Sequence, residues 1–275
     1  MDFRATGGQD KGPMAALIER IQERTGEMVL DALASVGRFA EMLLDMVRGL
    51  PEWRVWLPRT FEEAWSIGVG SLFIVILISS FTGAVTALQA GYQFTGNVPV
   101  YVVGSLVTES VILELGPVLV GLILAGRIGA RYAAELGTMR VTEQIDALES
   151  LGRSPSSYLL LPRVLACLLM IPMLVVLADL VAVGSGWIAS RSTIGISNED
   201  FTYGSRAYWH PFDGWYSVIK AFFFAGAIAL VSCYQGFNTR HGAEGVGKST
   251  TGAVVASSVL ILLLDTVLAK LLLKQ

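Results

Sequence analysis

A long uncharged stretch constrains the fold of this chain more than any other feature of its sequence. Between Glu63 and Glu109 no Asp, Glu, Lys or Arg occurs. A membrane-spanning helix needs about 20 apolar residues, so this stretch holds one span and the start of a second, separated by a turn at residues 96–99. Only 16% of all residues are charged, whereas about 25% are charged in a typical soluble domain. The sequence therefore predicts an integral membrane protein.

The distribution of apolar residues predicts an all-α fold with five membrane-spanning helices. Residues 63–275 form the membrane domain, with spans at about 66–91, 100–126, 160–190, 216–237 and 250–273. Residues 191–215, between the third and fourth spans, are polar and rich in aromatic side chains. The two cysteines lie in apolar runs, which favours packing over a disulfide or zinc site.

The segment before the first span divides into two parts. Residues 1–13 are polar and rich in glycine, and we expect them to be disordered. Residues 14–62 contain an amphipathic helix followed by an elbow, marked by Pro51 and Pro58 with two tryptophans between them. Its charges prevent it from spanning the hydrocarbon, so we expect it to lie in the membrane interface; a soluble partner helix is the alternative. No apolar signal-peptide region precedes the spans, so insertion is expected to rely on an internal span.

Charge predicts the orientation of the chain. Lys and Arg residues are far more numerous in the segments on the N-terminal side of the five spans than on the opposite side. Because positively charged loops remain in the cytoplasm, we expect a cytoplasmic N-terminus and a cytoplasmic segment at residues 127–157.

Residues 114–151 begin as an apolar segment and end as a charged one, and the change falls at Arg127. Small residues recur every four positions across this change and form a stripe that another helix can approach closely: Gly121, Ala125, Gly129, Ala133 and Gly137. Residues 134–151 read as an amphipathic cytoplasmic helix with Val141, Ile145 and Leu148 on one face. From this pattern alone, a docking helix and a solvated connecting helix are equal alternatives.

Five ionisable residues lie within the predicted spans, where they are costly and are candidates for function: Glu109, Glu114, Asp179, Lys220 and Asp265. Lys220 is expected to offset one of the carboxylates. Glu109 and Glu114 are about 140° apart around a helix, which argues against a catalytic carboxylate pair. We find no hydrolase or metal-binding motif, and we expect neither a catalytic site nor a cofactor.

Residues 242–249 match the G-x-x-x-x-G-K-[ST] pattern of a nucleotide-binding P-loop letter for letter. A P-loop needs a strand that enters it, a helix that leaves it and a sheet that carries an acidic partner for Mg²⁺. Two predicted spans flank this segment, so no nucleotide-binding domain fits there. We interpret it as a Gly-rich turn in which Ser249, Thr250 or Thr251 caps the fifth span.

Two motifs resemble the signatures of the MlaE/YrbE permease family. The first is ELGPVLVGLILAGRIGARYAAELGTMRVTEQIDAL at residues 114–148. The second is G-x-x-G-V-G-K-S-T-T-G-A-V-V-x-S-S at residues 242–258, followed by Asp265; family members often have Ala where Lys248 stands. The resemblance covers the chain from the amphipathic N-terminal segment to the last span. It implies the permease subunit of an ABC transporter that moves phospholipids and supports membrane lipid asymmetry, while a separate ATPase subunit hydrolyses ATP.

The resemblance also implies partners and sites. The expected partners are a second copy of this chain, ABC ATPase subunits and an MCE-domain protein in the bacterial inner membrane, and a STAS-domain accessory protein is a further candidate. Residues 134–151 would be the coupling helix that docks on the ATPase, with these contact residues: Glu135, Met139, Arg140, Glu143, Gln144, Asp146 and Leu148. Glu114, Lys220 and Asp265 would belong to a lipid-binding cavity or support it, and a structural ion pair is the alternative. The first span would supply apolar cavity wall at Leu72, Leu77, Leu88 and Tyr92.

Two other functions compete with this interpretation. An ion- or proton-coupled channel or secondary transporter could use the buried carboxylates, but such proteins often contain repeated spans, and we see no repeat. A membrane NTPase would rest on residues 242–249 alone.

Overall fold

The computed structural model describes residues 30, 33–93, 99–240 and 242–273. It divides into two units, residues 1–47 and 48–275. In the first unit, residues 33–47 are helical, as expected for the amphipathic segment. The predicted disordered segment 1–13 lies outside the described residues.

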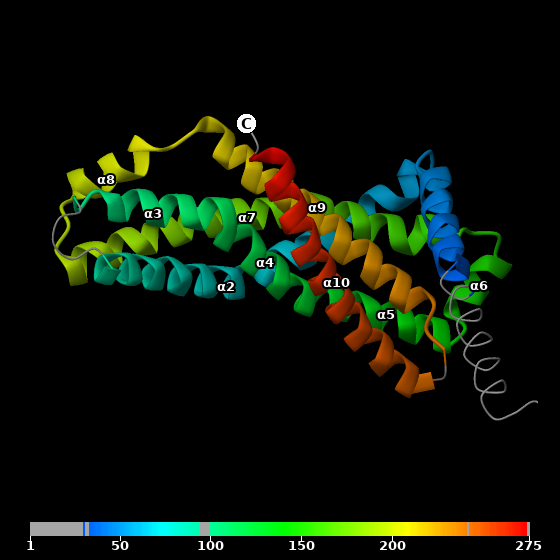
Figure 1. Cartoon of the computed structure of the whole chain (residues 1–275). Helices are drawn as coiled ribbons and strands as arrows, with labels where there is room; N and C mark the ends of the chain where they lie inside the picture. The colour runs from blue at the N-terminus through cyan, green and yellow to red at the C-terminus, as the bar shows by residue number, and fades with distance from the viewer. Residues whose placement is uncertain (1–29, 31–32, 94–98, 241, 274–275) are drawn as a thin grey trace, which may run out of the picture. The chain divides into compact units, whose positions relative to one another are not determined.

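The described residues of the second unit form five helices, or continuous runs of helices, that are long and apolar enough to cross a membrane, as predicted (Figure 1). The first is α2 (Trp53–Gln93) and the last two are α9 (Pro211–Phe237) and α10 (Gly242–Leu272). The second crossing joins α3 (Val102–Ser110), η1 (Val111–Leu115), α4 (Gly116–Leu124), η2 (Ala125–Gly129) and α5 (Ala130–Val141). The third joins η3 (Ser156–Leu160), α7 (Leu161–Ala189) and η4 (Ser190–Ile194).

Two short helices lie outside these crossings. Helix α6 (Gln144–Ser150) follows α5, and α8 (Asn198–Ala207) lies in the polar segment before α9. The Ser197 hydroxyl caps α8 by accepting a hydrogen bond from the Asp200 backbone N–H at 3.1 Å. Helix α8 packs along α3, where Gly104 and Gly204 allow backbone contact (Figure 1).

Small residues set the closest helix contacts in the second unit. A Cβ atom on Gly83 of α2 would lie 1.8 Å from the Ala182 carbonyl oxygen of α7, so the two helices touch through their backbones. The predicted stripe of small residues faces α9 and the residues just after it: Cβ atoms on Gly121 and Gly129 would meet Phe224 and Ser232 of α9 at 3.2 and 2.8 Å, and one on Gly137 would meet Thr239, two residues beyond α9, at 2.9 Å. The stripe therefore holds the second crossing against α9, which is the helix with the largest buried share.

The predicted helix at 134–151 is wrong in one respect. Helix α5 ends at Val141, and Glu143 has a positive φ of 59° before α6 begins at Gln144. The chain therefore bends at Thr142–Glu143, and the predicted common face is broken: Ile145 is buried whereas Val141 is 37% exposed. A single helical period cannot describe a face that a left-handed residue interrupts.

Two predicted helix boundaries are also wrong. Pro58 lies inside α2, and the break in the chain is confined to the turn at residues 50–52. Helix α10 begins at Gly242, so none of the three hydroxyl residues proposed as caps lies at its start. Instead, the Thr250 and Thr251 hydroxyls donate to the carbonyl oxygens of Val246 and Gly247 in the preceding turn.

Candidate functional site

Three of the predicted ionisable residues form one cluster, in which two carboxylates pair with a buried lysine. Lys220 of α9 is fully buried, and its Nζ donates to Oε2 of Glu114 at 2.7 Å. The same Nζ forms an ion pair with Asp265 of α10. It also lies 5.0 Å from the centre of the Tyr216 ring. We call Glu114, Lys220 and Asp265 the Lys220 cluster.

The local backbone explains why Lys220 binds here. Pro117 has no N–H, so it cannot donate to the carbonyl of Leu113 four residues earlier. The chain adapts through the π-turn η1, in which the Gly116 N–H donates to the Val111 oxygen. The Leu113 carbonyl then accepts a hydrogen bond from Lys220 Nζ at 3.0 Å. Pro117 thus frees a backbone acceptor where a buried cation needs one.

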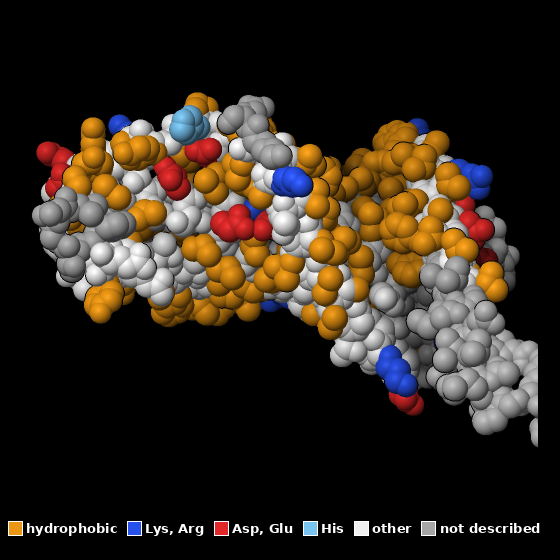
Figure 2. Space-filling model, in the orientation of Figure 1, with side chains coloured by type: hydrophobic (Ala, Val, Ile, Leu, Met, Phe, Trp, Pro, Cys, Tyr) orange, Lys and Arg blue, Asp and Glu red, His pale blue; other side chains and the backbone are white. Residues whose placement is uncertain are grey.

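The Lys220 cluster reaches the surface of this chain mainly through Glu114. The side chain of Glu114 is 52% exposed, that of Asp265 is 12% exposed, and that of Lys220 is not exposed. Hydrophobic side chains occupy a large part of the face seen in Figure 2, interspersed with other side chains and backbone. A carboxylate that opens from a charged cluster onto an apolar surface can contact an amphiphile that has both a polar head and acyl chains.

The two other predicted ionisable residues lie outside the Lys220 cluster. Asp179 of α7 is buried, and its Oδ2 accepts a hydrogen bond from the Ser217 hydroxyl at 2.7 Å. Its other oxygen lies against Gly116, where a Cβ would be only 1.8 Å away. Asp179 therefore ties α7 to α9 beside the π-turn η1 that carries Glu114. Glu109 of α3 lies two residues before η1 and forms no ion pair among the described residues.

An apolar pocket of about 590 Å³ lies between α2 and α7. Leu72 lines it, together with residues that the sequence did not single out: Phe61, Ala64, Trp65, Gly68, Val69, Leu169, Met170, Met173, Leu174 and Leu177. The other three predicted wall residues do not line this pocket. Leu77, Leu88 and Tyr92 are 43%, 39% and 85% exposed on the surface of this single chain.

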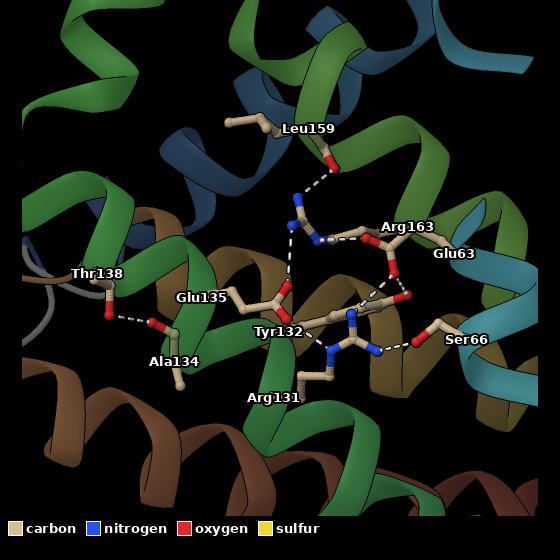
Figure 3. Close-up of polar contacts among 9 residues, drawn as sticks. All are labelled: Glu63, Ser66, Arg131, Tyr132, Ala134, Glu135, Thr138, Leu159 and Arg163. Atoms are coloured by element: carbon tan, nitrogen blue, oxygen red, sulfur yellow. Dashed lines mark hydrogen bonds and ion pairs between the residues drawn. The ribbon is translucent and has the colours of Figure 1, made fainter. Parts of the chain in front are cut away.

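A second charged cluster, which the sequence reading missed, joins α2, α5 and α7 (Figure 3). Arg163 is buried, and its guanidinium contacts Glu135 at 3.1 Å, Glu63 at 3.6 Å and the Leu159 carbonyl oxygen at 3.0 Å. Arg131 pairs with the same two carboxylates, Glu135 at 2.7 Å and Glu63 at 3.8 Å. We call Glu63, Arg131, Glu135 and Arg163 the basal network. The four-residue spacing of Arg131 and Glu135 was visible in the sequence, but their partners on other helices were not.

The predicted coupling residues lie in four different settings. Glu135 belongs to the basal network, so its carboxylate is bound within this chain. Met139 and Leu148 are half-buried, whereas Glu143 and Gln144 are exposed at the bend before α6. Arg140 pairs with Asp146 at 2.5 Å and lies over the Phe237 ring, so it ties α6 to the ends of α5 and α9.

Neither cluster resembles a metal site. No group of three or more His, Cys, Asp or Glu side chains suited to a metal ion occurs within the described ranges. The two acidic members of the Lys220 cluster are already neutralised in part by a lysine. The arrangement is suited to holding helices together and to contacting a polar headgroup.

Comparison with known proteins identifies the family. Residues 60–271 match the family described as Permease MlaE. A probable ABC transporter permease protein of Rickettsia prowazekii is 36% identical over 94% of this chain and all of its own length. The intermembrane phospholipid transport system permease protein MlaE of Haemophilus influenzae is 31% identical over 90% of this chain and 95% of its own. The chloroplastic protein TRIGALACTOSYLDIACYLGLYCEROL 1 of Arabidopsis thaliana is 35% identical over 83% of this chain and 64% of its own. This chain is an ABC transporter permease that belongs to the MlaE family.

Proposed function

We propose that this chain moves phospholipids between the membrane and an MCE-domain partner, driven by a separate ATPase subunit. The observation that carries the proposal is the Lys220 cluster: a charged group within apolar helices that opens to the chain surface at Glu114. Permease relatives, one of them named for intermembrane phospholipid transport, support the same function. The chain would act as a homodimer in the bacterial inner membrane, with its N-terminus in the cytoplasm.

We propose that Glu114 contacts the lipid while Lys220 and Asp265 support it. Replacing Glu114 with Gln leaves the buried Lys220–Asp265 pair in place, so the fold should survive. Glu109→Gln is the matched control, because it neutralises a carboxylate on the same crossing outside the cluster. In vesicles containing the permease, ATPase and MCE partner, Glu114→Gln should slow phospholipid transfer several-fold while Glu109→Gln does not. Equal transfer rates in both variants would assign the cluster to structure alone.

We propose that α6 and the bend before it dock on the ATPase. Their exposed acidic residues offer polar contacts, and the Arg140–Asp146 pair links α6 to α5, which continues into the membrane crossing. Glu143→Lys reverses a charge that has no ion-pair partner among the described residues, so it tests docking without breaking that link. It should lower ATPase recovery in a pull-down and abolish transfer, whereas full association and transfer would exclude this contact.

The competing ion- or proton-coupled function has one supporting observation, the buried carboxylate of Asp179 beside the Ser217 hydroxyl. It predicts ion flux by the purified chain without ATP. Purification from native membranes in mild detergent, followed by mass spectrometry, separates the two functions. A co-purifying ATPase, MCE protein and phospholipid support lipid transport, whereas a lone chain with ATP-independent flux supports the alternative.

A further inference from the structure

One exposed arginine within a membrane crossing has no partner among the residues that the structure describes. Arg127 lies in the π-turn η2, and none of the hydrogen bonds, ion pairs or ring contacts among the described residues involves it. Its Nη2 lies beside Gly70 of α2, 3.1 Å from the position that a Cβ would take. Any larger residue at position 70 would crowd the guanidinium, so Gly70 leaves the space that Arg127 occupies.

Arg131, the next arginine on the same crossing, has the carboxylate partners that Arg127 lacks. Arg131 is bound by two carboxylates of the basal network and by the Ser66 hydroxyl at 2.5 Å. Arg127 and Gly70 lie four residues further along their antiparallel helices than Arg131 and Ser66, in the direction of the middle of each crossing. Arg127 is therefore about 6 Å deeper in the membrane than the basal network, and it forms no ion pair with a carboxylate of the described part of the chain.

The surroundings of Arg127 are those of an amphiphile site. Phe73 and Leu77 follow Gly70 at three and seven positions on α2, so they share its face. Their side chains are 77% and 43% exposed. An unpaired guanidinium at membrane depth is costly, and its planar fork is suited to two hydrogen bonds with a phosphate. A phospholipid supplies the anion to Arg127 and the acyl chains to the apolar face beside it.

We propose that Arg127 binds the phosphate of a membrane phospholipid in the leaflet nearest α6, with the acyl chains on the face of Phe73 and Leu77. Thirteen residues separate Arg127 from Glu114 along one continuous crossing, which places this site about 20 Å from the Lys220 cluster. The site would hold a lipid between the basal network and the Lys220 cluster, about 6 Å deeper in the membrane than the basal network. Its role in transport rests on the proposed function, whereas the binding itself can be measured separately.

The experiment compares the permease–ATPase complex containing wild-type chain, Arg127→Gln, Arg127→Lys or the control Arg191→Gln. Arg191 is an exposed arginine near the other end of a crossing. Native mass spectrometry after exchange into nanodiscs measures the retained lipid, with dioleoylphosphatidylglycerol as the probe and dioleoylglycerol as its phosphate-free match. Arg127→Gln should weaken phosphatidylglycerol retention about tenfold or more and leave dioleoylglycerol unchanged. The phosphatidylglycerol retention of Arg127→Lys should lie between those of wild type and Arg127→Gln, and that of Arg191→Gln should equal that of wild type.

Three outcomes would overturn the inference. The first is equal phosphatidylglycerol retention in wild type and Arg127→Gln. The second is a lower dimer fraction in Arg127→Gln with unchanged lipid, which would assign the guanidinium to a carboxylate of a second copy. The third is that added inorganic phosphate abolishes the difference in phosphatidylglycerol retention between wild type and Arg127→Gln, which would identify a site for a free anion. If wild type moves phospholipid and Arg127→Gln retains it normally, only this inference fails; if wild type moves none, the proposed function fails.

Discussion

Two Lys–Glu ion pairs with the same N–O distance allow a direct test of how burial changes the contribution of an ion pair to stability. Lys220 Nζ lies 2.7 Å from Glu114, and Lys248 Nζ lies 2.7 Å from Glu244. The Lys220 side chain is not exposed, whereas the side chains of Lys248 and Glu244 are 78% and 77% exposed. Replacing either lysine with Met removes one charge and keeps a side chain of similar length, so any difference in stability reflects the surroundings.

We expect Lys220→Met to lower the free energy of unfolding several times more than Lys248→Met does. Removing one partner of a buried ion pair costs about 3–5 kcal/mol, because the other charge stays buried and unpaired. Glu114 is half-exposed and can be solvated, but Asp265 is only 12% exposed. We therefore expect the lower end for Lys220→Met, about 3 kcal/mol, or roughly a hundredfold in the unfolding equilibrium. An exposed pair contributes about 0–1 kcal/mol, so Lys248→Met should remain below about 1 kcal/mol.

Reversible unfolding in mixed micelles with increasing SDS measures both variants, with the fluorescence of the six tryptophans as the signal. The double variant Lys220→Met/Asp265→Asn removes the stranded charge as well, so it should recover much of the lost stability. Equal shifts for Lys220→Met and Lys248→Met would refute the reasoning. So would a double variant less stable than Lys220→Met, because the loss would then not come from an unpaired Asp265.

Two further predictions concern packing and orientation. Gly83→Ala should lower the midpoint of thermal unfolding, with a cost of about 1–3 kcal/mol, because the new Cβ meets a backbone carbonyl of α7; Gly184→Ala, with no atom within 4 Å, should be nearly neutral in the same melt. The two native cysteines are buried, so Glu143→Cys should supply the reactive thiol for an impermeant maleimide. Labelling in inside-out vesicles but not in intact cells is expected, and the reverse pattern would invert the predicted orientation.

The membrane fold could be predicted because each crossing is marked by a long run of apolar residues, all of which contribute to the same prediction. Each crossing contributes about 20 apolar residues, and no local exception cancels such a run. The bend at Glu143 could not be predicted in this way, because a single non-glycine residue with positive φ leaves the apolar period on both sides intact. Helix existence was therefore readable from the sequence, whereas the break within residues 134–151 was not.

The candidate sites, like the fold, could be predicted from the sequence only in part. An unpaired cation within a membrane crossing is costly. The sequence therefore predicted that Lys220 pairs with a carboxylate. Which carboxylates bind it depends on the register of α9 against α10 and on the π-turn at Pro117. The basal network was harder to foresee, because Glu63 and Arg163 are a hundred residues apart and become neighbours only through the packing of α2 on α7.

The P-loop match at residues 242–249 shows how one set of letters gives two structures. A phosphate cradle needs several backbone N–H groups that point into one concave loop. Here the whole motif lies in α10, where only the first four N–H groups of the helix are free and the amides of Gly247, Lys248 and Ser249 lie beyond them. Lys248 reaches back one turn to Glu244 instead of forward to a phosphate. A helix directs these groups along its axis, so residues 242–249 do not form the concave loop of N–H groups that a phosphate cradle needs.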